Sequence, residues 1–162
     1  KEKQVSAVFF VTYDYVKRND ELVRRMINEG HIVGNHSWSH PSMPDLSVEE
    51  CRDEVQKLHD YVKENYNYEM VYIRPPRGEF SERSLAASQS VGYKSIFWSF
   101  AYKDYDVNNQ PDADKAFTRI TEAAHSGAIY LLHAVSKTNT EILGRVIDKW
   151  RSDGYTIAKF DI

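Results

Sequence analysis

Residues 5–36, VSAVFFVTYDYVKRNDELVRRMINEGHIVGNH, contain the pattern that indicates the fold. The stretch 5–12 is rich in β-branched and aromatic residues, as buried strands are. Residues 19–30 follow as a helix, with Asn19 as the expected N-cap and Gly30 as the C-terminal stop. Residues 31–36 read as a second short strand. A strand, a helix and a strand in succession predict two parallel strands joined by a helical crossover.

The same alternation continues to the end of the chain. Further helices are expected over 47–66, 81–92, 112–127 and 140–154, and further strands over 72–76, 93–100, 128–136 and 155–162. Ser47 and Glu50 have the spacing of a capping box at the start of the longest helix. This order predicts an α/β fold with a parallel sheet. A doubly wound open sheet and an incomplete β/α barrel both fit, and both gather their chemistry at the carboxyl ends of the strands.

Composition excludes several classes of function. The 162 residues suit one domain, and 41% hydrophobic residues suffice for one core. The net charge is −3 without a basic stripe, so nucleic acid is not an expected partner. No apolar run approaches the roughly 20 residues of a membrane span. Cys51 is the only cysteine and is interpreted as structural.

The segment NHSWSH places His36 and His40 four residues apart after a predicted strand. Two imidazoles at this spacing suit a divalent transition metal if both lie on one turn. Pro41 disfavours a continuing helix, so the pair is expected on a short turn at the strand end. A solvated pair of surface histidines is the alternative interpretation at this point.

Other strand ends also carry polar residues. Arg74 and Arg77 flank a rigid Pro-Pro bend in RPPRG, where they could hold a carboxylate or simply stiffen a surface loop. Asp104 follows the strand over 93–100. His133 follows the most apolar strand, where a general acid and a buried structural histidine are both plausible. Because the carboxyl ends of parallel strands share one face, these residues predict an active site there.

The motifs FFVT, EGHIVGNHSWSHP, RPPRG, FWSFAYKDY and GAIYLLH, in this order, resemble the polysaccharide deacetylase family of carbohydrate esterases. Within the family, RPPRGEFSE and LLHAVS resemble the spore-cortex branch, which removes acetyl groups from N-acetylmuramic acid of peptidoglycan. The resemblance implies a distorted, incomplete β/α barrel and metal-assisted hydrolysis of an N-acetyl group on a cell-wall glycan. It also implies an extracytoplasmic location, secreted or associated with the cell envelope.

The resemblance assigns roles to individual residues. His36 and His40 become the metal ligands, with Zn as the expected ion and Mg, Mn or Co as alternatives. His133 becomes the general acid, Arg74 the residue that orients the catalytic base, and Asp104 a support of the polar network. The expected substrate contacts are Leu131, which lines the acetyl pocket, together with Tyr105, Trp38 and Arg77.

The sequence also departs from the family pattern. The family begins with a strand that ends in T-F-D-D-G or T-F-D-N-G and supplies the catalytic base, and this motif is absent here. Residues 1–162 are therefore expected to be an N-terminally truncated catalytic domain that is inactive by itself. Ala101 also replaces a common family Asp. An unpaired strand edge would follow from the missing strand, so the 162 residues are expected to be unstable alone, to form a homodimer through that edge, or to be completed by a segment outside this sequence. The alternative function is a non-catalytic glycan-binding remnant of the same fold.

Overall fold

A parallel sheet lies at the centre of the first two thirds of the chain. The computed structural model describes residues 1–160. The sheet has four strands in sequential order, all parallel: β1 (Val8–Val11), β2 (Ile32–Asn35), β3 (Tyr72–Ile73) and β4 (Lys94–Ser95). A doubly wound sheet would reverse its strand order, whereas a β/α barrel keeps it sequential. The predicted α/β class is confirmed, and the order is that of part of a barrel.

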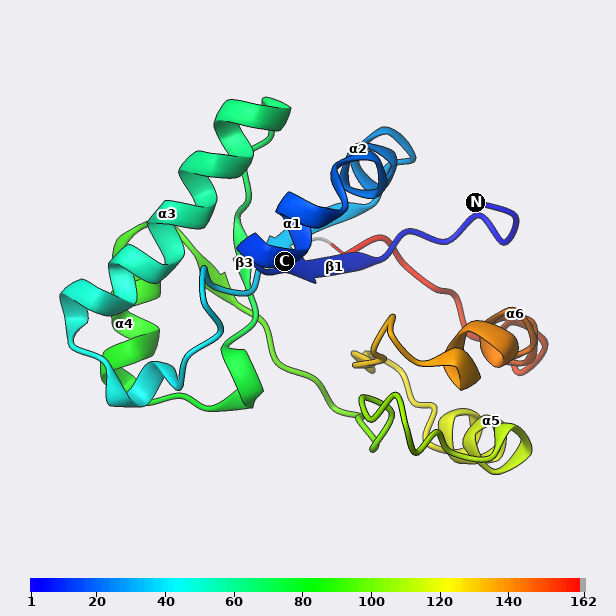
Figure 1. Cartoon of the computed structure of the whole chain (residues 1–162). Coiled ribbons are helices and arrows are strands. Elements are labelled where there is room, and N and C mark those ends of the chain that lie inside the picture. The colour runs from blue at the N-terminus through cyan, green and yellow to red at the C-terminus, as the bar shows by residue number, and fades with distance from the viewer. Residues whose placement is uncertain (161–162) are drawn as a thin grey trace. The chain divides into compact units, whose positions relative to one another are not determined.

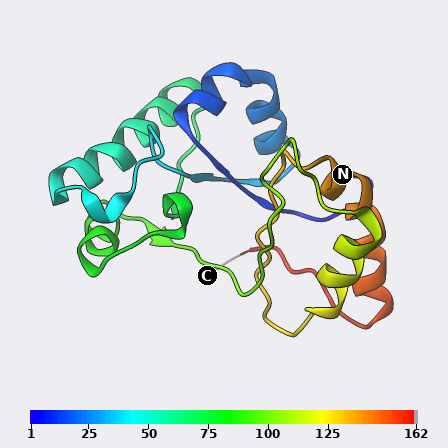
Figure 2. The same ribbon diagram turned by 60° about the horizontal axis from the view of Figure 1, so that its bottom comes forward.

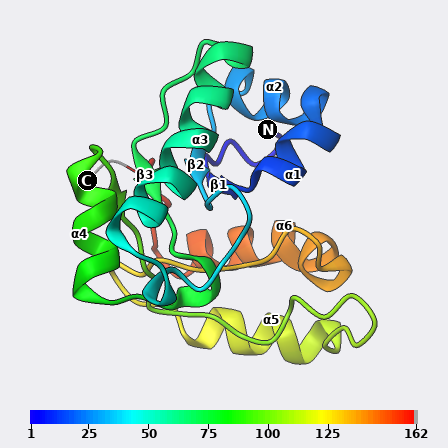
Figure 3. The same ribbon diagram turned by 60° about the vertical axis from the view of Figure 1, so that its left-hand side comes forward.

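Helices connect these strands. They are α1 (Tyr13–Arg18), α2 (Asp20–Asn28), α3 (Val48–Tyr66) and α4 (Glu82–Ser90), with short 3-10 helices η1 (Met43–Asp45) and η2 (Pro76–Gly78). Figure 3 shows α2 and α3 beside β2. The capping box of Ser47 and Glu50 is present at the start of α3. Helix α1 was not predicted; Thr12 caps it by accepting a hydrogen bond from the Tyr15 N–H.

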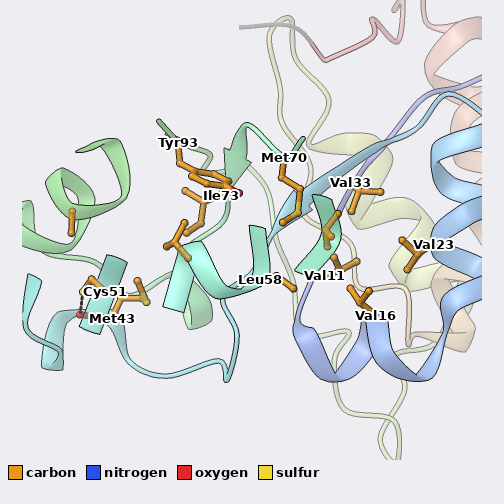
Figure 4. Close-up of a cluster of buried hydrophobic side chains, with 13 residues drawn as sticks. Val11, Val16, Val23, Val33, Met43, Cys51, Leu58, Met70, Ile73 and Tyr93 are labelled. Atoms are coloured by element: carbon orange, nitrogen blue, oxygen red, sulfur yellow. Dashed lines mark hydrogen bonds between the residues drawn. The ribbon is translucent and has the colours of Figure 1, made fainter. Parts of the chain in front are cut away.

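The core of this part of the chain joins the strands to their helices (Figure 4). Val11 of β1 and Val33 of β2 lie in one buried cluster with Leu58 of α3. Cys51 is fully buried in the same cluster, and its thiol faces the Met43 carbonyl oxygen at 3.3 Å. Burial of these apolar side chains fixes the strand ends from which the polar loops emerge.

A second group of elements follows residue 97. Helices α5 (Ala113–Glu122) and α6 (Lys137–Ser152) lie side by side in Figures 1 and 2. Their facing side chains form a separate buried cluster that includes Ile120 of α5 and Val146 of α6. Tyr102, in the segment before α5, belongs to the same cluster. This part of the chain therefore has a core of its own.

The two strands expected over 128–136 and 155–162 do not form as predicted. Within 128–136 only one parallel bridge is present, between Tyr130 and Phe100. The ladder stops there because the His133 N–H donates to the Asp104 carboxylate instead of to a neighbouring strand. Residues 155–160 are not assigned as a strand, and 161–162 lie outside the described residues.

The chain divides into two compact units, each of which includes a short terminal segment from the opposite end of the chain. Residues 6–97 form one unit together with Lys159 and Phe160, and Trp98–Ala158 form the other together with Lys1–Val5. Lys3 forms an ion pair with Asp148 of α6 at 2.6 Å. At the opposite end, the Phe160 ring packs edge-on against Tyr72 of β3. The expectation of a single catalytic domain over 1–162 stays a prediction.

Candidate functional site

The predicted metal loop leaves the sheet at the end of β2. Asn35 is the last residue of β2 and pairs with Ile73 of β3. The Arg74 N–H donates to the Asn35 carbonyl oxygen at 3.0 Å. His36 and Arg74 therefore follow neighbouring parallel strands at the same edge of the sheet, as the sequence predicts.

Asn35 holds the loop from inside the protein. Its side chain is fully buried and donates to the Val55 carbonyl oxygen at 2.9 Å and to the Tyr93 hydroxyl at 3.2 Å. Its Oδ1 accepts the Ser37 N–H at 2.8 Å. The Ser37 hydroxyl in turn accepts the His40 N–H at 2.9 Å. These bonds hold the loop in a tight turn, in which Ser37 and His40 both have positive φ.

Glu54 of α3 fixes the middle of the same loop. Its carboxylate accepts the backbone N–H and the hydroxyl of Ser39, both at 2.8 Å. Its backbone carbonyl accepts the Trp38 N–H at 3.0 Å. Because α3 is anchored in the core through Leu58 and its neighbours, the loop is tied to a rigid element.

The His36 ring has the tautomer that a metal ligand needs. Its Nδ1 lies 2.7 Å from the Arg74 carbonyl oxygen, which only accepts, so Nδ1 carries the proton. The lone pair is then on Nε2, which lies 3.2 Å from Nη2 of Arg74. A ligand histidine usually donates its second N–H to a carbonyl or carboxylate in this way.

His40 supplies a second imidazole. Its ring centroid lies 4.8 Å from that of His36, with the rings edge to face. Burial lowers the pKa of His40, and the positive charges of Arg77 and Arg74 lower it further. A neutral imidazole is the form that binds a metal. The pair thus fits two ligand positions of a divalent ion. Within residues 1–160, His36 and His40 have no third His, Cys, Asp or Glu side chain beside them that would complete a metal site of three such ligands.

A second constellation lies in the unit that contains α5 and α6. Asp104 is fully buried there, and its Oδ1 lies 2.6 Å from Nδ1 of His133. Its Oδ2 accepts the His133 backbone N–H at 2.7 Å and the Asn139 amide at 2.6 Å. The His133 side chain remains 30% exposed. An acid-base histidine needs this combination of a held ring and access to substrate.

The buried carboxylate keeps its charge. Burial alone would raise the pKa of Asp104, but the hydrogen bonds from His133 and Asn139 outweigh burial and lower it. An ionised Asp104 accepts the proton on Nδ1 of His133, which leaves Nε2 to exchange a proton with a substrate. The same division of labour orients the histidine of serine hydrolases.

Comparison with known proteins identifies the family. The family model for polysaccharide deacetylases matches residues 1–96, more than half of the chain. The chain belongs to the polysaccharide deacetylase family. The resemblance drawn from the motifs is therefore confirmed. An uncharacterised 30.6 kDa protein of Geobacillus stearothermophilus is 48% identical over 162 residues, which are 99% of this chain and 61% of that protein.

Two further relatives have solved structures. The peptidoglycan N-acetylmuramic acid deacetylase PdaA of Bacillus subtilis is 40% identical over 99% of this chain and 62% of its own length. The PdaA structure, a family 4 carbohydrate esterase, has a TM-score of 0.91 over 96% of this chain and 67% of that chain. A family 4 pseudoenzyme from Bacillus anthracis is 30% identical with a TM-score of 0.88, over 96% of this chain and 54% of that one. The chain thus spans about three fifths of the length of the Geobacillus stearothermophilus protein and of PdaA.

The expected substrate contacts of this deacetylase-family chain lie around both constellations. Tyr105 is 58% exposed, and its ring centroid lies 5.7 Å from that of His133. Leu131 is half-buried on the segment that leads to His133. Trp38 is half-buried and stacks on Tyr13 at 3.6 Å between centroids. Arg77 is exposed and has a positive φ of 59°. Their roles toward a substrate stay predictions.

The sequence reasoning missed four polar side chains that hold these constellations. They are Asn35, Glu54, Tyr102 and Asn139. Asn139 stands three residues after the helix N-cap Ser136, a spacing that a systematic search for caps would find. No local signal marks Glu54, because its partner Ser39 lies 15 residues away.

Proposed function

We propose that the chain carries most of the active site of a peptidoglycan N-deacetylase that acts on N-acetylmuramic acid. Family membership and the 40% identity to PdaA support this substrate class. The buried Asp104–His133 pair is the observation that carries the proposal, because its geometry suits proton transfer to a departing amine. Metal assistance is supported by the His36 ring, whose Nδ1 faces a carbonyl oxygen, and by the lowered pKa of His40.

The proposed roles are those that the family resemblance implies, and the geometry of His36, His40 and His133 supports them. His36 and His40 would hold a divalent ion, with Zn the expected metal and Mg, Mn or Co the alternatives. When bound, such an ion polarises the acetyl carbonyl and lowers the pKa of a bound water. His133 is held through Nδ1 and gives a proton from Nε2 to the amine that leaves. Arg74, whose Nη2 lies beside Nε2 of His36, orients the carboxylate base by ion pairing.

The T-F-D-D-G or T-F-D-N-G motif that supplies the carboxylate base in the family is not among the 162 residues. We therefore propose that the 162-residue chain alone does not hydrolyse N-acetyl groups, because no carboxylate takes the proton from the attacking water. Acetate release from N-acetylated peptidoglycan measures this directly. The chain should release no more acetate than its His36→Ala variant, and release well above that variant would overturn this part of the proposal.

The activity itself is tested on the gene product that contains these residues. Acetate and free muramic amine released from peptidoglycan are measured for the wild type and for His133→Gln. We expect the wild type to release both and the variant to lose at least about a hundredfold in rate, the range that general acid catalysis supplies. Release that is equal in both would exclude His133 as the acid.

A non-catalytic glycan-binding protein is the second candidate, and the structural likeness to a family pseudoenzyme favours it specifically. The coding sequence before the Lys1 codon separates the two. A T-F-D-D-G or T-F-D-N-G strand there supports the enzyme. Its absence from the reading frame, together with peptidoglycan binding and no acetate release, supports the binding protein.

Location and assembly are proposed on the same basis. Among residues 1–160, no helix has the length and apolarity needed to cross a membrane. A peptidoglycan substrate places the action outside the cytoplasm. Strand β1 pairs with β2 alone among the described strands, which leaves its other edge to a further strand. Pairing of two β1 edges is the proposed route to a homodimer, and concentration-dependent sedimentation tests it.

A further inference from the structure

Asn139 of α6 contacts both members of the Asp104–His133 pair. Its Nδ2 lies 2.6 Å from Oδ2 of Asp104 and 3.2 Å from the His133 carbonyl oxygen. Both atoms are acceptors, so the side of the amide that faces them must be the NH₂ group. One hydrogen is thus directed to the carboxylate and the other to the backbone of the histidine. A single side chain links the two residues of the pair.

The other face of the Asn139 amide is held by Tyr102. Its Oδ1 must be an acceptor, and the Tyr102 hydroxyl donates to it. Both residues are buried. Burial raises the pKa of Tyr102 to about 12, and the nearby charge of Asp104 acts in the same direction, so the hydroxyl keeps its proton at neutral pH. The donor direction along this chain of hydrogen bonds is therefore fixed from Tyr102 to Asp104.

The backbone of Asn139 is also fixed. It is in the first turn of α6, where its N–H donates to the side chain of the N-cap Ser136 at 3.1 Å. The Ser136 hydroxyl in turn donates to Oε1 of Gln110 at 2.8 Å. Ser136 is fully buried. A side chain on a capped helix start is more precisely placed than one on a free loop.

We propose that Asn139, held by the Tyr102 hydroxyl, is a positioning residue that orients the Asp104 carboxylate and thereby keeps His133 in the tautomer with the proton on Nδ1. This inference rests on the proposed function, in which Nε2 of His133 exchanges the proton. Asn139 touches no reacting atom and acts through Asp104. Nothing in the family resemblance or in the comparisons assigns it a role.

The physical reason lies in the two oxygens of Asp104. Oδ2 has two donors, the His133 N–H and the Asn139 amide, whereas Oδ1 meets the His133 ring. Without the amide, the carboxylate keeps one donor on Oδ2 and gains freedom to rotate about its Cβ–Cγ bond. Rotation would lengthen the bond from Nδ1 of His133, and the neutral ring would then populate both tautomers. Only the tautomer with the proton on Nδ1 has a lone pair on Nε2, where the ring takes up the proton that the resulting imidazolium then gives to the amine.

Nitrogen-15 NMR of the His133 ring in the full 162-residue chain tests the proposal, because ring nitrogen shifts distinguish the tautomers without any turnover. The wild type should show protonated Nδ1 in the neutral ring, with a slowly exchanging proton. Asn139→Leu keeps the side-chain shape but removes the amide, and it should give a tautomer mixture. Tyr102→Phe removes only the outer hydroxyl, and it should speed exchange of the Nδ1 proton at least about fivefold.

Thr140→Val is the matched control. Thr140 lies in the same turn and bonds to the Ser136 carbonyl oxygen, but it is exposed and does not contact Asp104. In this variant, the tautomer of the His133 ring and the exchange rate of its Nδ1 proton should equal those of the wild type. An unchanged His133 ring in Asn139→Leu overturns the proposal. If that variant does not fold, unchanged exchange in Tyr102→Phe overturns it instead.

Kinetics of the active gene product separate this inference from the proposed function. Tyr102→Phe should lower kcat several-fold and leave KM unchanged, because Asn139 and Tyr102 are not expected to contact substrate. If Asn139→Leu loses the Nδ1 tautomer but the wild type does not deacetylate peptidoglycan, the positioning role of Asn139 is supported and the proposed function is refuted. If the wild type deacetylates peptidoglycan but the His133 tautomer is unchanged in Asn139→Leu, the proposed function is supported and the positioning role of Asn139 is refuted.

Discussion

Replacement of Asn35 by Ala should loosen the histidine loop more than any single change on its surface. The substitution removes three hydrogen bonds: to the Val55 carbonyl, to the Tyr93 hydroxyl and from the Ser37 N–H. Each bond contributes about 1 kcal/mol, and an unsatisfied buried N–H costs about 1–3 kcal/mol. Ser37 is fully buried, so water does not readily replace the lost acceptor. We expect a loss of about 3 kcal/mol of local stability.

Amide hydrogen exchange of Ser37 reads this quantity at the affected site. A loss of about 3 kcal/mol corresponds to about a hundredfold faster exchange. Asn65→Ala is the control, because Asn65 is exposed and donates one bond to the Tyr61 carbonyl oxygen in α3. It should leave Ser37 exchange unchanged. Less than a tenfold acceleration in Asn35→Ala would refute the view that Asn35 holds the loop.

Three further perturbations have defined outcomes. Arg74→Met removes the cation beside Nε2 of His36 but keeps an apolar contact with Phe10, so it should tighten Zn²⁺ binding about tenfold by calorimetry; weaker binding would contradict this. Glu54→Ala removes the acceptor of Ser39 and should weaken Zn²⁺ binding about fivefold, whereas equal affinity would show that metal binding does not depend on the Glu54–Ser39 hydrogen bonds. The pKa of Asp104 is lowered from 3.8, so the folded state binds fewer protons than the unfolded state; its stabilisation is complete above that value and is lost as pH falls through the lower folded value. Urea unfolding between about pH 5 and pH 2 should show a steeper loss of stability in the wild type than in Asp104→Asn; an equal pH slope in both would contradict the assignment.

The placement of His36 and Arg74 at one edge of the sheet was predictable, because the carboxyl ends of parallel strands lie at the same edge. His36 and Arg74 are 38 residues apart, yet each follows its strand by one position, and register places them together. The capping box of Ser47 and Glu50 was equally accessible, because both groups are local in the chain. Patterns that depend on neighbours in sequence, or on a repeated strand-helix unit, can be interpreted without coordinates.

The features that the sequence did not predict depend on contacts between residues far apart in the chain or on weak local signals. Residues 128–136 have the composition of a buried strand, but a side-chain carboxylate takes the N–H of His133 and ends the ladder after one bridge. The role of Asn139 likewise depends on Tyr102, 37 residues earlier. Helix α1 was missed because only Thr12 marks its start, after a run with strong strand propensity.

The exchange of chain ends between the two units has a consequence for synthesis. Lys1–Val5 leave the ribosome long before the α6 residues that Lys3 contacts, because about 140 residues lie between them. At typical rates of about 5–20 residues per second, the delay is on the order of ten seconds. During that time the first five residues must remain free while the sheet forms behind them. Phe160, which packs on Tyr72, arrives after its own unit is otherwise complete. The unit formed by residues 6–97 thus gains its contact with Phe160 only after the whole of the other unit has been synthesised.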